Sequence, residues 1–429
     1  MERKVSSPMA PTFMVSAPGK VIVFGEHAAV FGKPAVAAAI SLRSYLLVTT
    51  LTKSRRTVTL NFRDIGLNHT WTIDSLPWPV FHHASKKKFY YSVIHSLDPE
   101  LLNAIKPHAE AVSRDLPEKQ RRMHVRSATA FLYLFLSLGS SQSPGFIYTL
   151  RSTIPIGAGL GSSASICVCL STALLLQTRS LAGPHPDQPL KEAEVQIERI
   201  NHWAYVGELC IHGDPSGVDN TVSSRGKAVL FQKNTSGPSS VTPLVNFPKL
   251  RLLLVDTRQP RSTATQVGKV RRLKDSHPTT TGLILDAIGQ LTASALELLS
   301  SANFNDALGV SHPRLQRVCE LVDHSGIGWT KLTGAGGGGC AITLLRPDVN
   351  EETLEELDRR FTAEGFQKYD AILGADGVGV LWPAVFRNGS AGENGEEIDQ
   401  EKFENAVGAR GMEQLVGVGR DREGWRFWT

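Results

Sequence analysis

The sequence has little of what marks secreted, membrane or metal-stabilised proteins. Its five cysteines are an odd number and contain no CxxC pair, so neither a disulfide framework nor a zinc site is predicted. The longest apolar runs, Ala128–Leu138 and Ile166–Leu176, are about half of the ~20 residues that a helix needs to cross a bilayer. The N-terminus lacks the long apolar stretch of a signal peptide. These absences predict a protein without a membrane anchor and with a cytoplasmic location.

What the chain does have is the composition of a large globular protein. Its 429 residues are 41% apolar and 20% charged, which excludes a largely disordered chain and leaves room for one large or two ordinary domains. There are 46 basic and 41 acidic residues, which give a net charge of +5. This mild positive charge is compatible with an anionic small-molecule substrate, but it is too diffuse to predict nucleic-acid binding.

Local patterns predict both helices and strands. Strand-like runs occur at 45–51, 57–62, 70–73, 145–152 and 251–255, and helical spacing occurs at 123–138, 191–211 and 283–299. A stretch rich in Ser, Thr, Pro and Gly at 234–248 is expected to be a domain linker or a boundary loop. We therefore predict a flexible arm over 1–12, domains over 13–240 and 241–385, and a glycine-rich, acidic, partly disordered tail over 386–429.

One glycine-rich segment, PIGAGLGSSA at 155–164, lies between a strand-like run and an apolar, helix-like run. Its glycines permit close approach of the backbone, and the N-terminus of the following helix adds about half a positive charge. Ser162 and Ser163 offer hydroxyls for helix capping or for Mg²⁺. The pattern predicts a cradle for a triphosphate, although a capped strand-to-helix turn has the same local signature. It is not a Walker A loop, because no Gly-Lys pair in the chain is followed by Ser or Thr.

A second glycine run, KLTGAGGGGCAITLL at 331–345, formally contains a GxGxxG pattern. A dinucleotide-binding fingerprint needs a helix after its glycines, whereas an apolar, β-branched segment follows them here. The run therefore argues against a dinucleotide oxidoreductase. It favours a loop whose backbone approaches a ligand or a neighbouring loop.

Two further segments carry candidate catalytic groups. The segment ELCIHGDPSGVDN places Glu208 late on a predicted helix and Asp219 just after a Pro/Gly turn. Phosphoryl transfer uses one carboxylate for Mg²⁺ and another near the attacking hydroxyl. The segment SAPGKVIVFGEH places Lys20 at the start of a strand, where it could meet an anionic base and a substrate oxygen. Taken alone, each segment has a simpler interpretation, since Asp, Ser, Pro and Gly dominate turns and a lysine after a turn is usually solvated.

Together and in this order, the four segments resemble the GHMP kinases, which include galactokinases, homoserine kinases, mevalonate kinases and phosphomevalonate kinases. The similarity spans residues 15–383, and HGDPSGVDN is most similar to the mevalonate kinases. The resemblance implies a two-domain α+β fold with an N-terminal ribosomal S5-like domain and a C-terminal ferredoxin-like domain. It implies ATP-dependent phosphorylation of the C5 hydroxyl of (R)-mevalonate, in isoprenoid and sterol synthesis. It also implies a homodimer and inhibition by prenyl diphosphates, and the tail is similar to that of fungal members.

The resemblance also implies roles for individual residues. Asp219 is expected to be the general base or orienting carboxylate, with Lys20 as its cationic partner, and Ser163 and Glu208 are expected to hold Mg²⁺. The residues expected to contact the nucleotide phosphates are Pro155, Gly157, Ala158, Gly159, Leu160, Gly161, Ser162 and Ser163. Those expected to contact mevalonate are His27, Ser216, Arg261, Thr263 and Gly336. Asp214 stands where the family usually has asparagine, and it either adds a carboxylate near the site or caps a turn.

Three other functions stay open on the sequence. Another GHMP kinase, acting on a sugar or on phosphomevalonate, would share the phosphate chemistry and differ in its acceptor. An inactive sensor would bind ATP and substrate without turnover, but the joint presence of Lys20, Ser163, Glu208 and Asp219 argues against it. An oxidoreductase is disfavoured by the context of both glycine runs.

Overall fold

The structure is a computed structural model that describes residues 11–428 except 53, 84, 87–95, 186, 235–238, 259–262, 299–311, 324, 335, 387–395 and 419–423. The strands are β1 (Phe13–Phe24), β2 (Pro34–Thr50), β3 (Thr57–Phe62), β4 (Leu67–Thr72), β5 (Phe146–Ser152), β6 (Ala228–Gln232), β7 (Ser240–Leu244), β8 (Leu250–Asp256), β9 (Gly328–Leu332), β10 (Cys340–Leu345), β11 (Gln367–Leu373), β12 (Gly379–Leu381), β13 (Val385–Phe386), β14 (Glu396–Glu397) and β15 (Trp425–Phe427). The α-helices are α1 (Trp78–Phe81), α2 (Pro99–Glu110), α3 (Glu118–Leu138), α4 (Ser162–Gln177), α5 (Leu190–His212), α6 (Val218–Arg225), α7 (Thr263–Ser276), α8 (Pro278–Leu298), α9 (Pro313–Asp323), α10 (Glu351–Ala363), α11 (Gln400–Asn405) and α12 (Gly408–Val416). The predicted α+β class is confirmed.

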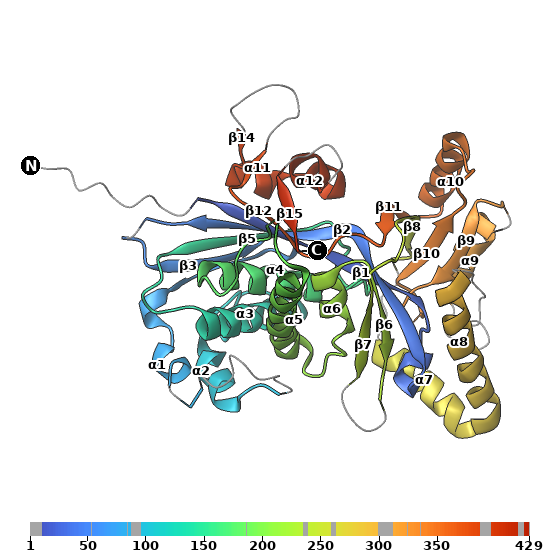
Figure 1. Cartoon of the computed structure of the whole chain (residues 1–429), viewed down its shortest axis with the longest axis horizontal. Helices are drawn as coiled ribbons and strands as arrows, with labels where there is room; N and C mark the ends of the chain where they lie inside the picture. The colour runs from blue at the N-terminus through green and yellow to red at the C-terminus, as the bar shows by residue number, and fades with distance from the viewer. Residues whose placement is uncertain are drawn as a thin grey trace, which may run out of the picture.

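The longest strand, β2, connects the N-terminal part of the molecule (β1–β7 with α1–α6) to the C-terminal part (β8–β11 with α7–α10). Its first half, Pro34–Ala38, pairs with β6, and its second half, Ser44–Thr50, pairs with β5. Between them, Ile40 pairs with Leu373 of β11, from which the sheet continues through β8 and β10 to β9. A single 13-stranded sheet therefore runs through both parts (Figure 1).

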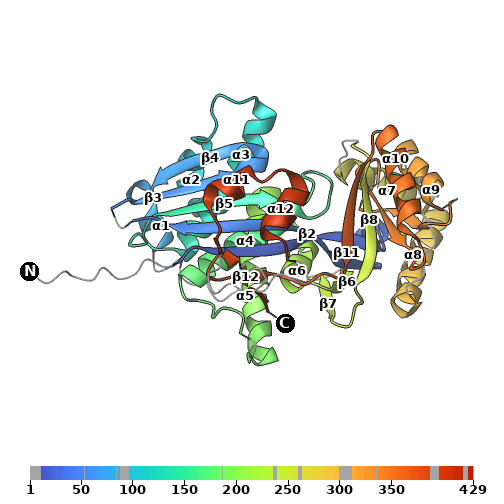
Figure 2. The ribbon, with the colours of Figure 1, turned by 90° about the horizontal axis from the view of Figure 1, so that it is seen from above.

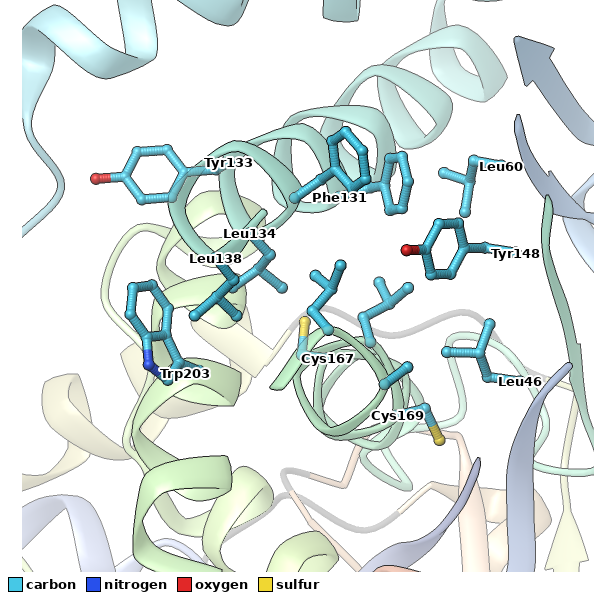
Figure 3. Packing of buried hydrophobic residues seen from close by; sticks show 14 of the residues in the cluster. Leu46, Leu60, Phe131, Tyr133, Leu134, Leu138, Tyr148, Cys167, Cys169 and Trp203 are labelled. Carbon is cyan, nitrogen blue, oxygen red and sulfur yellow. The ribbon is translucent and has the colours of Figure 1, made fainter. Parts of the chain in front are cut away.

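Helices α3, α4 and α5 cover one face of the N-terminal part of this sheet (Figures 1 and 2). The central helix, α4, is apolar on all sides, and all of its residues from 167 to 176 are buried. Figure 3 shows Cys167 and Cys169 on this helix, surrounded by side chains that include Phe131 and Tyr148. None of the helices in the described part of the chain combines the length and apolar character that crossing a bilayer requires.

Apolar side chains of β1 and β2 point to both faces of the sheet, so the sheet has a second apolar face. Val15 and Leu46 belong to the core under α3–α5, whereas Met14, Tyr45 and Leu47 belong to a separate cluster on the other side. Successive side chains of a strand point to opposite faces, so both faces need a cover. Helices α11 and α12 lie over this second face (Figure 1).

The segment predicted as a partly disordered tail contains well-defined elements where the structure describes it. We call residues 396–418 and 424–428, which form β14, α11, α12 and β15, the cap. Phe403 and Met412 of the cap pack in the cluster with Tyr45, and β15 pairs with β12. The guanidinium of Arg151 on β5 donates to the backbone oxygens of Phe403, Glu404 and Ala406 at 2.7–2.9 Å. The cap is therefore built into the sheet.

The stretch 234–248, predicted as a linker, also differs from that expectation. Its residues Ser240–Leu244 form β7, which pairs along its length with β6. The strand lies at the edge of the sheet and most of its side chains are partly or fully exposed, so polar residues and a proline are accommodated there. The domain boundary predicted at residue 240 falls inside the sheet, on this strand. Most of the predicted arm over 1–12 lies outside the described residues.

Candidate active site

The glycine-rich segment 155–164 forms the turn between β5 and α4. Gly157, Gly159 and Gly161 have φ angles of 78°, 80° and 74°, in the left-handed region that favours glycine. Gly161 is the N-cap of α4, and no side chain caps this helix. The first amide groups of a helix have no intrahelical partner, and together with the helix dipole they attract an anion. This turn thus has the geometry of an anion-binding helix N-terminus.

Lys20 on β1 is held against this turn by its backbone and by its side chain. Its amide donates to the Leu160 carbonyl at 2.9 Å, and its Nζ donates to the Gly159 carbonyl at 3.3 Å. A Cβ atom at position 161 would lie 2.9 Å from the Cγ of Lys20, so a side chain there would displace the lysine. Glycine at 161 therefore serves both the turn and the placement of Lys20.

The ammonium group of Lys20 lies 3.3 Å from a carboxylate oxygen of Asp219. Asp219 is in the first turn of α6, a helix that begins at Gly217 in a left-handed conformation. The positive end of the helix dipole favours a carboxylate at this position. The lysine side chain is 9% exposed and the aspartate side chain 33%, so the pair lies at the bottom of an open site.

Glu208 lies near the end of α5, behind the cavity wall. Burial, and then the negative charge of Asp219, raise the pKa of Glu208 to about 8, against the opposing effects of the Ser163 hydroxyl and Lys20. One oxygen of Glu208 is 3.9 Å from the Nε2 of His212, one helical turn further along α5. At pH 7 Glu208 is therefore mostly protonated, and Asp219 is the carboxylate that pairs with Lys20.

These groups surround one cavity of about 860 Å³. The predicted residues that line it are Lys20, His27, Pro155, Gly157, Gly159, Leu160, Gly161, Ser162, Ser163, Ser216 and Asp219. Three predicted residues, Ala158, Glu208 and Gly336, are buried and lie outside this lining set. The cavity also has an apolar side, formed by residues that include Leu60, Phe62, Met123, Leu150 and Ile166. It therefore joins an anion-binding turn to an apolar surface.

Two contacts place the second glycine run beside β1. The hydroxyl of Thr333 donates to the Ile22 carbonyl at 3.1 Å and accepts from the Ile22 amide at 3.2 Å. Lys331 forms an ion pair with Glu26, and both side chains are almost buried. These contacts bring Gly334 to the cavity wall and join the C-terminal part of the molecule to the site.

The remaining predicted residues are Arg261 and Thr263. Arg261 is outside the described residues, and Thr263 is described by its backbone alone, as the first residue of helix α7. Val267, one turn after Thr263 on the same helix, lines the cavity. Helix α7 therefore contributes to the cavity wall through Val267.

Sequence reasoning missed several cavity residues, among them His212 and the cations Lys119, Arg122 and Arg126 of α3. Arg122 is paired with Glu118 at 2.7 Å. Within the described part of the chain, Lys119 and Arg126 form no ion pair with a carboxylate. For His212, the spacing of four residues from Glu208 on one helix was an available signal.

Comparison with known proteins agrees with this geometry. Residues 124–227 match the GHMP kinases N terminal domain and residues 285–363 match the GHMP kinases C terminal domain. The first match includes the glycine-rich turn at 155–164, Glu208 and Asp219. The crystal structure of L. major mevalonate kinase in complex with R-mevalonate shares the fold, with a TM-score of 0.59 at 20% identity, over 88% of this chain and all of that one.

Curated relatives match over the entire chain. The mevalonate kinase of Aspergillus fumigatus is 68% identical over 100% of this chain and 84% of its own length. The mevalonate kinase of Gibberella zeae is 60% identical over 100% of this chain and 90% of its own length. The family inferred from four short motifs is thereby confirmed over the full length. The chain belongs to the mevalonate kinase family of the GHMP kinases.

Proposed function

We propose that this protein transfers the γ-phosphoryl group of ATP to the C5 hydroxyl of (R)-mevalonate, giving ADP and 5-phosphomevalonate. The observation that carries the proposal is the pair formed by Lys20 and Asp219, 3.3 Å apart, in the same cavity as the anion-binding turn. This arrangement supplies a base, a cation and a phosphate cradle within one site. Family membership supports the same reaction.

The turn at 155–163 would hold the triphosphate of ATP. Its backbone amides at the start of α4 donate to phosphate oxygens, and the helix dipole offsets part of their charge. The apolar side of the cavity, with Phe62 and Met123, suits the adenine ring. Lys119 and Arg126 on α3 add positive charge on the side of the cavity that they line.

Asp219 would accept or orient the C5 hydroxyl proton of mevalonate as the hydroxyl oxygen attacks the γ-phosphorus. An alcohol is a weak nucleophile at neutral pH, and assistance by a positioned base contributes roughly 10²–10⁴-fold. Lys20 would hold the carboxylate in place and stabilise negative charge on the attacking oxygen. The hydrogen bond from Lys20 to the Gly159 carbonyl would fix the ammonium group relative to the phosphates held by the turn. The reacting atoms would then be aligned before the reaction.

Ser163 and Glu208 would hold a divalent cation, for which Mg²⁺ is our proposal. A hydroxyl and one carboxylate are the oxygen donors that Mg²⁺ uses when substrate phosphates supply further ligands. Burial and the charge of Asp219 raise the pKa of Glu208, and a cation bound beside it would stabilise the ionised carboxylate. When bound, the cation offsets charge on the phosphate oxygens during transfer.

His27, Ser216, Arg261, Thr263 and Gly336 would form the mevalonate side of the site. His27 and Ser216 line the cavity beside Lys20 and Asp219. Mevalonate carries a carboxylate, which a guanidinium binds with two parallel hydrogen bonds, and Arg261 is our proposal for that role. The C-terminal part of the molecule would thus supply the groups that recognise the acceptor.

Prenyl diphosphates are proposed as competing ligands of the same cavity. Such a molecule joins a diphosphate to a hydrocarbon chain, and the cavity joins an anion-binding turn to an apolar side. Inhibition that ATP relieves would support this assignment. The homodimer stays a prediction from the family resemblance, and the cytoplasmic location stays a prediction from the sequence.

The reaction is tested by ADP release with Mg²⁺ and ATP across (R)-mevalonate, 5-phosphomevalonate, galactose and homoserine. Turnover with (R)-mevalonate alone is the expected result. Turnover with another acceptor would keep the phosphate chemistry and reject the proposed substrate. No turnover with any of them, while ATP still binds, would reject catalysis in favour of a sensor.

A further inference from the structure

His212 contacts both residues to which the proposed function assigns the divalent cation. Its Nε2 lies 3.0 Å from the hydroxyl oxygen of Ser163 and 3.9 Å from a carboxylate oxygen of Glu208. Both contacts use the same ring nitrogen. His212 is the last residue of α5, and Gly213 ends the helix with its amide bound to the Leu209 carbonyl at 2.9 Å. The ring position is therefore set by the end of a long helix.

A serine hydroxyl that binds a cation must direct a lone pair at the cation and its proton elsewhere. The proton therefore needs an acceptor that is not itself occupied by the cation. The carboxylate of Glu208 is assigned to the cation, so it does not fill this role. In this structure the Ser163 hydroxyl also donates to Glu208. Once Glu208 binds the cation, the Nε2 of His212, 3.0 Å away, is the acceptor within hydrogen-bond distance of the hydroxyl, in the tautomer that carries its proton on Nδ1.

We infer that His212 is a positioning residue, which accepts the Ser163 hydroxyl proton and so orients the oxygen of Ser163 toward the cation. This inference rests on the proposed function, in which Ser163 and Glu208 hold the cation. It deepens that function by adding a residue that acts through Ser163. Groups that orient metal ligands in this way typically change metal affinity by roughly 10- to 100-fold when they are removed.

The test separates cation binding from nucleotide binding. Calorimetry of the full-length protein gives the Kd of ATP in EDTA and in Mg²⁺, and the ratio of the two values measures how much the cation strengthens binding. We expect His212→Leu to lower this ratio by roughly tenfold or more while the Kd in EDTA stays close to wild type. His212→Gln should restore most of the ratio, because the end of a glutamine side chain reaches the position of Nε2. His212→Asn, which reaches only the position of Nδ1, should not.

A double substitution distinguishes this role from direct cation binding by His212. If His212 acts through Ser163, adding His212→Leu to Ser163→Ala should lower the ratio no further. An additional loss in the double variant, an unchanged ratio in His212→Leu, or a loss in EDTA equal to that in Mg²⁺ would each overturn the inference. If Ser163→Ala and Glu208→Gln both kept the wild-type ratio of the two Kd values, the proposed cation site itself would be rejected. The two failures are therefore distinguishable.

Discussion

The indole N–H of Trp428 donates to the side-chain oxygen of Gln196 at 3.0 Å, joining the end of the chain to α5. The same helix carries Glu208 and His212 near its C-terminal end. Trp428 also packs in the core under α3–α5. The cap thus contacts the helix from which two groups of the site project.

Truncating Trp428 should destabilise the whole protein. Its side chain is 3% exposed, and Trp428→Ala would leave a large cavity in the core, so we expect the free energy of unfolding to fall by about 3–5 kcal/mol. Urea denaturation measures this. Trp382→Ala is the matched control, because Trp382 is 44% exposed and stacks on Phe13 at the surface. Similar losses in the two variants would contradict the assigned burial.

Removing the carboxylate of Asp219 should impair catalysis far more than nucleotide binding. We expect Asp219→Asn to lower kcat by roughly 10²–10⁴-fold with little change in the Kd of ATP, because the base acts on the acceptor hydroxyl. Asp214→Asn is the control on the same loop, since Asp214 is exposed and lies outside the cavity lining. It should keep kcat near wild type. A comparable loss in Asp214→Asn would show that Asp214 belongs to the site.

Arg126 should contribute to nucleotide affinity. Its charge lowers the pKa of His212, as does burial, the larger cause, so the guanidinium acts at the Ser163 end of the cavity. We expect Arg126→Met to raise the Kd of ATP by about tenfold, since a hydrogen bond to a charged group contributes about 1.5–3 kcal/mol. Arg122→Met removes the same charge from a side chain already paired with Glu118 and should have a smaller effect. An equal increase in the Kd of ATP in both variants would show that the loss of one positive charge, and not a specific contact of Arg126, weakens ATP binding.

Cation binding should release protons in a pH-dependent way. With a pKa of about 8, Glu208 is mostly protonated at pH 7 in the metal-free protein, and it must ionise to bind a cation. Binding of Mg²⁺ and ATP at pH 7 should therefore release a proton from most Glu208 side chains, and the release should decline as the pH rises past the pKa of about 8. Calorimetry in buffers of different ionisation enthalpy measures it. Glu208→Gln should abolish this proton release. Proton release that persists in the variant would show that another group is its source.

The parts of the site that lie within one short segment could be predicted from the sequence. Residues 155–164 contain the turn, the helix N-cap and the anion site together, and local chemistry indicates all three. The approach of Lys20 to Asp219 came from family resemblance, because no spacing relates a strand near the N-terminus to a helix in the middle of the chain. Arg126 was missed because its direction depends on how α3 packs over the sheet.

The cap could not be predicted for a different reason. Two of its buried side chains, Phe403 and Met412, are single apolar residues in polar surroundings. Met412, Leu415 and Val416 follow helical spacing, but this stretch is too short to outweigh the glycine-rich, acidic composition, which suggested disorder. The fold of the cap depends on contacts with residues far away in the sequence, including Arg151 on β5 and Gln196 on α5.

The position of β1 in the sheet has a consequence for biosynthesis. This strand is among the first to leave the ribosome, yet one of its neighbours is β12, from Gly379–Leu381 near the end of the chain. At about 5–20 residues per second, that neighbour follows only after tens of seconds. Until then one edge of β1 presents unpaired backbone groups, which are a template for association with other chains. The nascent protein therefore completes this part of its sheet only once β12 has been synthesised, and we expect Met14–Ser16 to need protection from other chains until then.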